Sequence, residues 1–384
     1  MNMKHKGYVI TSVILMLLIG SVYTYSVFRP FVEEKFTLNT LRSGLPYMLS
    51  LFFYAVSMML TGRILTTKNQ KMILVIGIIL IGLGWFLAGF ATYFILFLIG
   101  YGVMIGVGVG MVYGIPIKGI QDRFPMKKGL MTGIVLLGFG LSTLIVAPLS
   151  TYLIDTFGLS QTFYIYAIIF MIVLIPISLI LGTHQDESQI LKSTNDHQKV
   201  LDVSSIKLYF YFVIATTIGL MMIGLSYYIG VTVYGFNPWS VALSMSLFAV
   251  MNGISRPIFG WLMDRKGFYY SVKLSLLLII TASLISIINQ GTHLVLFMAS
   301  YGLFWFNLGA WLAIIPTAVS IKYGRERYAK QYGLFFTGYG IGAIIGTLLS
   351  GFIMDLFGNT TYIYLIILVL MIGLWISTLK PLKN

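Results

Sequence analysis

The sequence has no cysteine and carries little charge. Without cysteine, a disulfide framework, a thiolate metal site and a cysteine nucleophile are all excluded. Charged residues make up only 9% of the 384 residues, against roughly 25% in a soluble domain. Hydrophobic residues make up 58%, and the mean hydropathy is +0.92. Because so little charge cannot cover a surface in water, the sequence predicts a membrane protein.

Acidic and histidine residues are also scarce, and they avoid the long apolar runs. The eleven acidic residues lie at the ends of these runs or between them, and none of the four histidines looks intramembrane. Proton-coupled carriers usually need a titratable group in the cavity, so no dedicated proton relay is predicted. Nothing inside would attract a cationic drug. No catalytic dyad or metal cluster is visible, so we expect no enzyme activity, no metal and no cofactor.

Long apolar runs are abundant. Each has about 20 residues, enough to cross a hydrocarbon core of ~30 Å as a helix, and the alternation typical of a membrane barrel is missing. The predicted fold is therefore all-α, with twelve transmembrane helices at about 8–30, 42–62, 71–90, 93–117, 129–153, 161–182, 207–231, 240–262, 270–289, 293–319, 331–353 and 360–379. Forty glycines suit closely packed membrane helices.

The formal charge of +14 follows the predicted spans. Lysines and arginines gather in alternate short loops, for example at Lys68 and Lys128. The other loops carry little charge, except the first, which has Arg29, Glu33, Glu34, Lys35 and Arg42. This is the positive-inside pattern, so we expect a multi-pass protein of the cell membrane with both termini cytoplasmic. The lipid bilayer, and not nucleic acid, accounts for the basic residues.

The chain repeats itself. Sliding it by 200 positions aligns Tyr101-Gly102 with Tyr301-Gly302 and Pro116 with Pro316. We predict a six-helix bundle over 1–182, a polar cytoplasmic linker over 183–206 and a second six-helix bundle over 207–384. Two such halves are typical of alternating-access transporters, with the substrate near the midplane.

One arginine stands inside an apolar span. Arg256 lies about two turns before the end of the eighth predicted helix, where a cation costs several kcal/mol, so it is a candidate functional residue. Asn252 lies one turn earlier on the same face and could share a ligand. A guanidinium offers a planar fork that matches a carboxylate. The alternative is an arginine that snorkels over some 10 Å to the helix end.

A charged turn follows this arginine: Gly260-Trp-Leu-Met-Asp264-Arg265-Lys-Gly267. The glycine permits a tight helix end, and Asp264 can cap the next helix or pair with a cation. The counterpart in the first half, which begins at Gly62, has lost the aspartate. The motif resembles the cytoplasmic loop signature of the major facilitator superfamily, which latches the two halves in one state. A plain turn with a few charges is the alternative.

A second set of motifs resembles one family within that superfamily. Gly106-x-Gly108-x-Gly110 is followed by Arg123-Phe-Pro, and Tyr23-Thr-Tyr25 lies in the first helix. Together they resemble the oxalate/formate antiporter family, relatives of the monocarboxylate transporters. The resemblance implies that Arg256 binds a substrate carboxylate and that Arg123 belongs to the gating segments. Dicarboxylate carriers of that family have a second cation, a lysine, in helix eleven, and this chain has none there. The missing lysine favours a monocarboxylate substrate such as formate, lactate or pyruvate.

Aromatic residues complete the expected site. In the resembling family, helices one, seven, ten and eleven line the cavity, and aromatics there cage a small anion. The candidates in this chain are Tyr23, Tyr227, Trp305 and Tyr339, with Asn307 as a polar side chain in helix ten. Interface belts and ordinary packing are the competing explanation.

The sequence thus favours a secondary active transporter of a small organic anion, as antiporter or symporter, functional as a monomer. Efflux of drug-like or amphipathic compounds through an aromatic cavity is the second hypothesis. A non-transporting membrane sensor on the same scaffold is the third.

Overall fold

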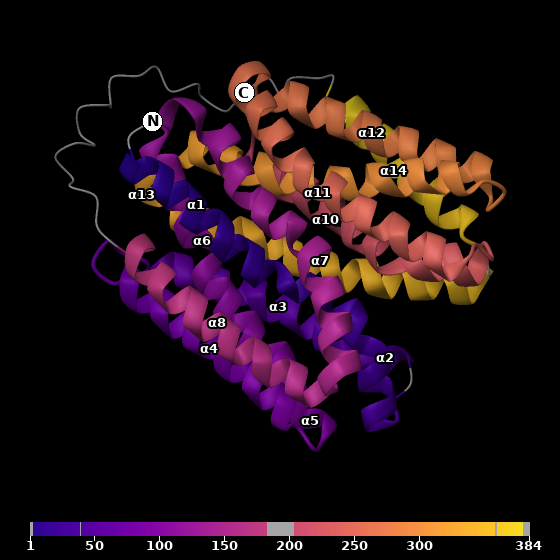
Figure 1. Ribbon diagram of the computed structural model, residues 1–384. Coiled ribbons are helices and arrows are strands. Elements are labelled where there is room, and N and C mark those ends of the chain that lie inside the picture. The colour runs from indigo at the N-terminus through magenta and orange to yellow at the C-terminus, as the bar shows by residue number, and fades with distance from the viewer. Residues whose placement is uncertain (1–2, 39, 183–202, 358, 379–384) are drawn as a thin grey trace. The chain divides into compact units, whose positions relative to one another are not determined.

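The computed structural model describes residues 3–38, 40–182, 203–357 and 359–378, and every regular element there is a helix (Figure 1). The first part of the chain forms α1 (Met3–Ile19), η1 (Gly20–Thr24), α2 (Tyr25–Phe36), α3 (Thr40–Ile64), α4 (Gln70–Phe90), α5 (Phe94–Phe97), η2 (Leu98–Ile105), α6 (Gly106–Arg123), η3 (Pro125–Lys127), α7 (Lys128–Phe157) and α8 (Leu159–Leu181). The second part forms α10 (Ser205–Tyr228), η5 (Ile229–Val233), α11 (Pro238–Lys266), α12 (Phe268–Asn289), α13 (Leu294–Phe357) and α14 (Thr361–Ser377).

These helices have the length and composition of membrane spans. Within the described ranges, ten helical stretches are long and apolar enough to cross a membrane, and α14 is a shorter apolar helix. One of the ten, Leu294–Leu349, bends at Gly324 and covers two of the predicted spans. A helix satisfies its own backbone hydrogen bonds, which the bilayer core requires. The all-α membrane fold predicted from the sequence is confirmed.

The predicted break between the tenth and eleventh spans coincides with a kink. Two helices meet within α13 at Gly324, whose φ of 68° is not helical and which lies between the predicted span ends at 319 and 331. Lysine, arginine and glutamate are good helix formers, so the charged residues on either side extend the two helices into the expected loop. Glycine adopts a positive φ without steric cost, which lets the chain turn at one residue.

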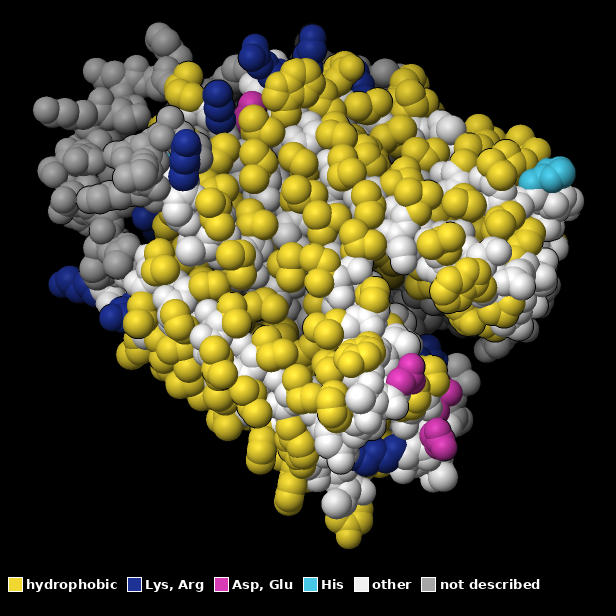
Figure 2. Space-filling view, viewed as in Figure 1, with side chains coloured by type: hydrophobic (Ala, Val, Ile, Leu, Met, Phe, Trp, Pro, Cys, Tyr) yellow, Lys and Arg dark blue, Asp and Glu magenta, His cyan; other side chains and the backbone are white. Residues whose placement is uncertain are grey.

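One face of α4 shows why the molecule needs lipid. Large apolar side chains stand exposed along the helix at intervals of three and four residues: Met72, Ile76, Ile79, Leu83, Phe86 and Phe90. The opposite face is buried and includes Gly77, Ile81 and Gly84. Figure 2 shows hydrophobic side chains over much of the surface in view. Such a stripe would aggregate in water and is stable against hydrocarbon.

The described chain divides into two compact units. Unit 1 comprises Met1–Pro125, Ile134–Val200 and Val319–Gly340, and unit 2 comprises Met126–Gly133, Leu201–Ala318 and Ile341–Asn384. In unit 1, α3 packs on α6, and α4 packs on α6 and α8; in unit 2, α12 packs on α14. The halves 1–182 and 207–384 remain a prediction, since two short segments group with the other half. Residues 183–202 of the expected linker lie outside the described residues.

Buried aromatic pairs agree with the internal repeat. Tyr101 and Tyr301 are both fully buried. Each ring packs against the phenylalanine four residues earlier, with centroid distances of 5.7 Å to Phe97 and 4.5 Å to Phe297. Residues at this spacing share one face of a helix. The 200-residue shift in the sequence therefore aligns positions with the same role in packing.

Candidate functional site

Arg256 lies on the buried face of α11. The sequence starts this helix with Asn237-Pro238; the Asn237 side chain accepts hydrogen bonds from the backbone N–H groups of Trp239 and Ser240, at 2.9 and 3.4 Å. Proline fits the first helical position because it lacks the N–H that would be unsatisfied there. Five turns later, Arg256 has 0% of its surface exposed. Its guanidinium therefore does not reach the surface as a snorkelling side chain would.

A chain of hydrogen bonds leads from Arg256 into the neighbouring helices of unit 2. Arg256 Nη2 donates to Asn252 Oδ1 at 2.9 Å, and Asn252 Nδ2 donates to the backbone carbonyl of Trp305 at 2.8 Å. The indole Nε1 of Trp305 donates to Ser226 Oγ at 2.9 Å. Ser226 donates in turn to the carbonyl of Met222 at 2.7 Å. We call the side chains of Ser226, Trp305, Asn252 and Arg256 the arginine relay.

The relay brings together three of the residues predicted from the sequence and one that was missed. Asn252, Arg256 and Trp305 were expected, whereas Ser226 was not. All four are buried, with Trp305 the most exposed at 7%. Ser226 lies within an apolar stretch of α10, and a lone serine there gives no sequence signal, because serines in helices commonly bond to their own backbone.

Two other predicted residues of unit 2 lie elsewhere. Asn307 accepts a hydrogen bond from Ser275 Oγ of α12 at 2.7 Å, so its amide oxygen serves helix packing. Tyr227, near the end of α10, is 47% exposed. Neither belongs to the arginine relay.

Tyr23 and Tyr339 meet in unit 1. Their hydroxyl groups form a short hydrogen bond, although the residues are 316 positions apart. Tyr339 is fully buried and stacks on Phe336 at 5.0 Å, while the Tyr23 ring packs edge-on against Phe139 at 5.1 Å. Tyr54 joins this aromatic cluster. The structure thus brings two predicted aromatics together from η1 and α13.

The carboxylate of Asp264 caps a helix. It accepts hydrogen bonds from the backbone N–H groups of Gly129 and Leu130, both at 2.8 Å. These are the second and third residues of α7, where the N–H groups lack helical partners and the helix dipole is positive. A side chain at Gly260 would overlap the carbonyl of Gly129, so the glycine lets α11 and α7 touch. Arg265 is exposed.

In unit 1, the residues predicted to belong to the latch, Gly62 and Arg123, make contacts of a different kind. A side chain at Gly62 would overlap the backbone carbonyl of Ala329, so α3 and α13 meet there closely. Arg123 stacks over the ring of Tyr8 at 3.5 Å and donates to the carbonyl of Gly119 at 3.0 Å. Its neighbour Asp122, which sequence reasoning did not single out, pairs with Arg325 at 3.0 Å. An ion pair thus bridges α6 and α13.

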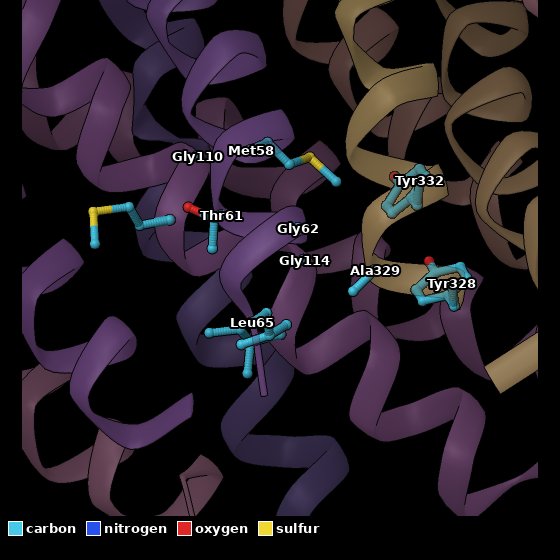
Figure 3. A pocket seen from close by; sticks show the side chains of 11 residues that line it. Met58, Thr61, Gly62, Leu65, Gly110, Gly114, Tyr328, Ala329 and Tyr332 are labelled. Carbon is cyan, nitrogen blue, oxygen red and sulfur yellow. The ribbon is translucent and has the colours of Figure 1, made fainter. Parts of the chain in front are cut away.

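A small hollow lies beside Gly62, between α3, α6 and residues 328–332 of α13 (Figure 3). Its volume is about 280 Å³, including space open to solvent. The lining residues are mostly small or flexible: Met58, Thr61, Gly62, Leu65, Gly110, Met111, Gly114, Ile115, Tyr328, Ala329 and Tyr332. Among the described residues, no group of three or more His, Asp or Glu is placed to hold a metal ion.

Known proteins resemble this chain along most of its length. An MFS-type transporter of Escherichia coli, YhjX, is 26% identical over 87% of this chain and 85% of its own. The oxalate:formate antiporter of Oxalobacter formigenes is 25% identical over 93% of this chain and 87% of its own. Monocarboxylate transporter 13 of Rattus norvegicus is 24% identical over 78% of this chain and 71% of its own.

Solved structures share the fold. The human organic anion transporter MFSD10 matches with a TM-score of 0.70 at 12% identity, covering 100% of both chains. The transporter FucP, in an outward conformation, matches with a TM-score of 0.68 at 18% identity, covering 99% of this chain and 100% of its own. At these identities the likeness shows the fold alone. The family model of the Major Facilitator Superfamily matches residues 11–323, and the chain therefore belongs to this superfamily of membrane transporters.

Proposed function

We propose that the protein is a secondary carrier for a small organic anion, in which Arg256 binds the anionic group. The observation that carries the proposal is the fully buried guanidinium of Arg256, in the second half of α11. The carboxamide oxygen of Asn252 accepts a hydrogen bond from the guanidinium at 2.9 Å. A positive charge inside a membrane span is energetically costly, which makes it a candidate functional group. A carboxylate matches the guanidinium in charge and in planar geometry.

The relatives support this substrate class. One is named an oxalate:formate antiporter and another a monocarboxylate transporter, and both match most of the chain. With identities near 25%, these names support small carboxylates as a class. Antiport and symport are both compatible with this support.

The sequence of the eleventh span favours one carboxylate over two. Residues 331–353 contain no lysine or arginine. A buried carboxylate without a compensating cation costs several kcal/mol, so a second carboxylate on the substrate would be poorly accommodated. Formate, lactate and pyruvate are therefore the preferred candidates, ahead of oxalate.

Transport would use the contacts of Gly260 and Asp264 with α7 as a latch that forms in one state and opens in another. The two hydrogen bonds to Gly129 and Leu130 are made without any covalent constraint, so they can break and reform. We place both termini on the cytoplasmic side of the cell membrane, because the basic residues follow the positive-inside pattern.

Replacing Arg256 tests the proposal. In proteoliposomes, Arg256→Ala is expected to lower uptake of the transported monocarboxylate at least about tenfold, since a hydrogen bond to a charged group contributes about 1.5–3 kcal/mol. Arg256→Lys keeps the charge without the planar fork and should retain part of the activity. Arg327→Ala, an exposed arginine of α13, is the matched control. Normal uptake by folded Arg256→Ala protein would refute the proposal.

A ligand screen identifies the substrate. The thermal stability of the purified protein is measured with formate, lactate, pyruvate, oxalate and lipophilic cations. A ligand that binds the folded state raises the melting temperature, so monocarboxylates should produce the largest shifts and Arg256→Ala should abolish them. Shifts with lipophilic compounds alone would favour the efflux hypothesis instead.

A further inference from the structure

We infer that Ser226 is a positioning residue for Arg256, acting through Trp305 and Asn252 along the arginine relay. The inference rests on the proposed function, because it concerns how the anion-binding guanidinium is held. Ser226 belongs to α10, Trp305 to α13, and Asn252 and Arg256 to α11. One serine hydroxyl would thus set the orientation of an arginine on another helix.

The first link fixes the indole of Trp305. Its Nε1 donates to Ser226 Oγ at 2.9 Å, and Trp305 is only 7% exposed. The serine hydroxyl is itself oriented, because its own proton points to the carbonyl of Met222 at 2.7 Å. A hydroxyl with its proton committed in this way presents a lone pair to the indole. The bond therefore orients the Trp305 indole and ties α13 to α10 at this residue.

The second link runs through the backbone of the same residue. The carbonyl of Trp305 accepts a hydrogen bond from Asn252 Nδ2 at 2.8 Å. With its amide nitrogen directed at that carbonyl, Asn252 must direct Oδ1 the other way, because the carboxamide is planar. This oxygen accepts the bond from Arg256 at 2.9 Å. Asn252 thus links the guanidinium to the backbone of Trp305.

Helix packing leaves little room for the relay to adjust. A side chain at Gly309, one turn after Trp305, would overlap the backbone carbonyl of Asn252 and the hydroxyl of Ser255. The α13 and α11 backbones are therefore in direct contact beside the relay. Three residues after Ser226, α10 changes into the π-helix η5. Wide turns of this kind often mark functional sites in helices.

The residues of the arginine relay have different roles. The indole N–H of Trp305 and the carboxamide of Asn252 are bonded within the protein, so we assign both to positioning. Arg256 alone carries the charge that attracts the anion. Removing Ser226 should accordingly weaken substrate affinity while the translocation rate of bound substrate changes little.

The test measures the half-saturating concentration and the maximal rate in proteoliposomes, with radiolabelled formate, lactate and pyruvate. Ser226→Ala is expected to raise the half-saturating concentration about 3- to 10-fold, the effect of one lost hydrogen bond, with the maximal rate per folded protein within about twofold of the parent. Ser283→Ala is the matched control, because this buried serine of α12 bonds to Ile279 of its own helix at 2.9 Å. It should leave both parameters unchanged.

Trp305→Phe provides the second variant. It removes the indole donor but leaves Ser226 bonded to Met222, so no buried donor is orphaned and folding is less disturbed. The double variant should be no weaker in affinity than the weaker single variant, because both changes remove the same bond. Multiplying effects in the double variant, or an effect of Ser283→Ala equal to that of Ser226→Ala, would overturn the inference.

Failure of the relay and failure of the proposed function are distinguishable. If Arg256→Ala is inactive while folded Ser226→Ala has the parent's half-saturating concentration, the relay is refuted and the anion site stands. If Arg256→Ala transports normally, the proposed function itself fails.

Discussion

Two glycines one turn apart on α6 have different surroundings. A methyl group on Gly110 would overlap the backbone carbonyl of Tyr54. A methyl group on Gly114 would meet only the Met58 side chain, at 3.7 Å, and would enter the hollow beside Gly62. The effect of replacing either glycine therefore depends on the atoms around it.

Alanine substitutions at these two positions should have opposite effects. Gly114→Ala fills open space and removes the conformational cost of a glycine in a helix, which is about 0.5–1 kcal/mol, so the melting temperature should rise. Gly110→Ala forces α6 away from α3 and should lower it by more than the same amount. Thermal unfolding of the purified variants measures both. A lower melting temperature for Gly114→Ala would show that the hollow is not available.

At the scale of helices, Asp264 and Asp122 each bind a group on another helix, but the two contacts differ in kind. Asp264 binds the unsatisfied N–H groups at the start of α7, within a closely packed backbone contact. Asp122 binds the side chain of Arg325, which is 38% exposed. A helix cap such as that of Asp264 contributes about 0.5–2 kcal/mol to stability. A surface ion pair contributes about 0–1 kcal/mol, and added salt weakens it.

Hydrogen exchange should distinguish these two contacts. Asp264→Asn removes the charge and one acceptor, so the amides of residues 126–133 are expected to exchange several-fold faster. Arg325→Ala should have a smaller effect on residues 319–330, and added salt should imitate it in the parent protein. Unchanged exchange at 126–133 in folded Asp264→Asn protein would contradict a role of this carboxylate in closing the latch.

At the scale of the whole molecule, the segment Val319–Gly340 follows unit 1, although it belongs to the second half of the sequence. It supplies Ala329 against Gly62, Gly333 against the backbone of Met58, and Arg325 to Asp122. Glycines at such contacts let backbones approach closely. Part of α13 therefore depends on α3 and α6 for its packing.

Splitting the chain tests this dependence. When fragments 1–182 and 207–384 are produced together, they should copurify and protect 319–340 from protease. Fragment 207–384 produced alone should be cleaved within that segment, because its backbone contacts with α3 are missing. Equal protection of the segment in the isolated fragment would argue that it packs independently of the first half.

The membrane environment and the helical class were already evident in the amino-acid sequence, which also showed the 200-residue repeat and singled out Arg256 as a candidate. Each of these follows from a property that neighbours do not change: the length of apolar runs, the scarcity of charge and the cost of a cation among apolar residues. Gly260 and Asp264 were singled out through the resemblance of their loop to the signature of the major facilitator superfamily.

The direction in which each side chain points follows from the packing of the helices, which the amino-acid sequence does not show. A helix that is apolar on every side gives no periodic signal for its neighbours, so Asn307 could not be assigned to its contact with Ser275 of α12. Ser226 and the Asp122–Arg325 pair likewise gave no local signal of their partners. Their partners lie 79 and 203 residues away along the chain, and only the packing of the helices brings them within hydrogen-bonding distance.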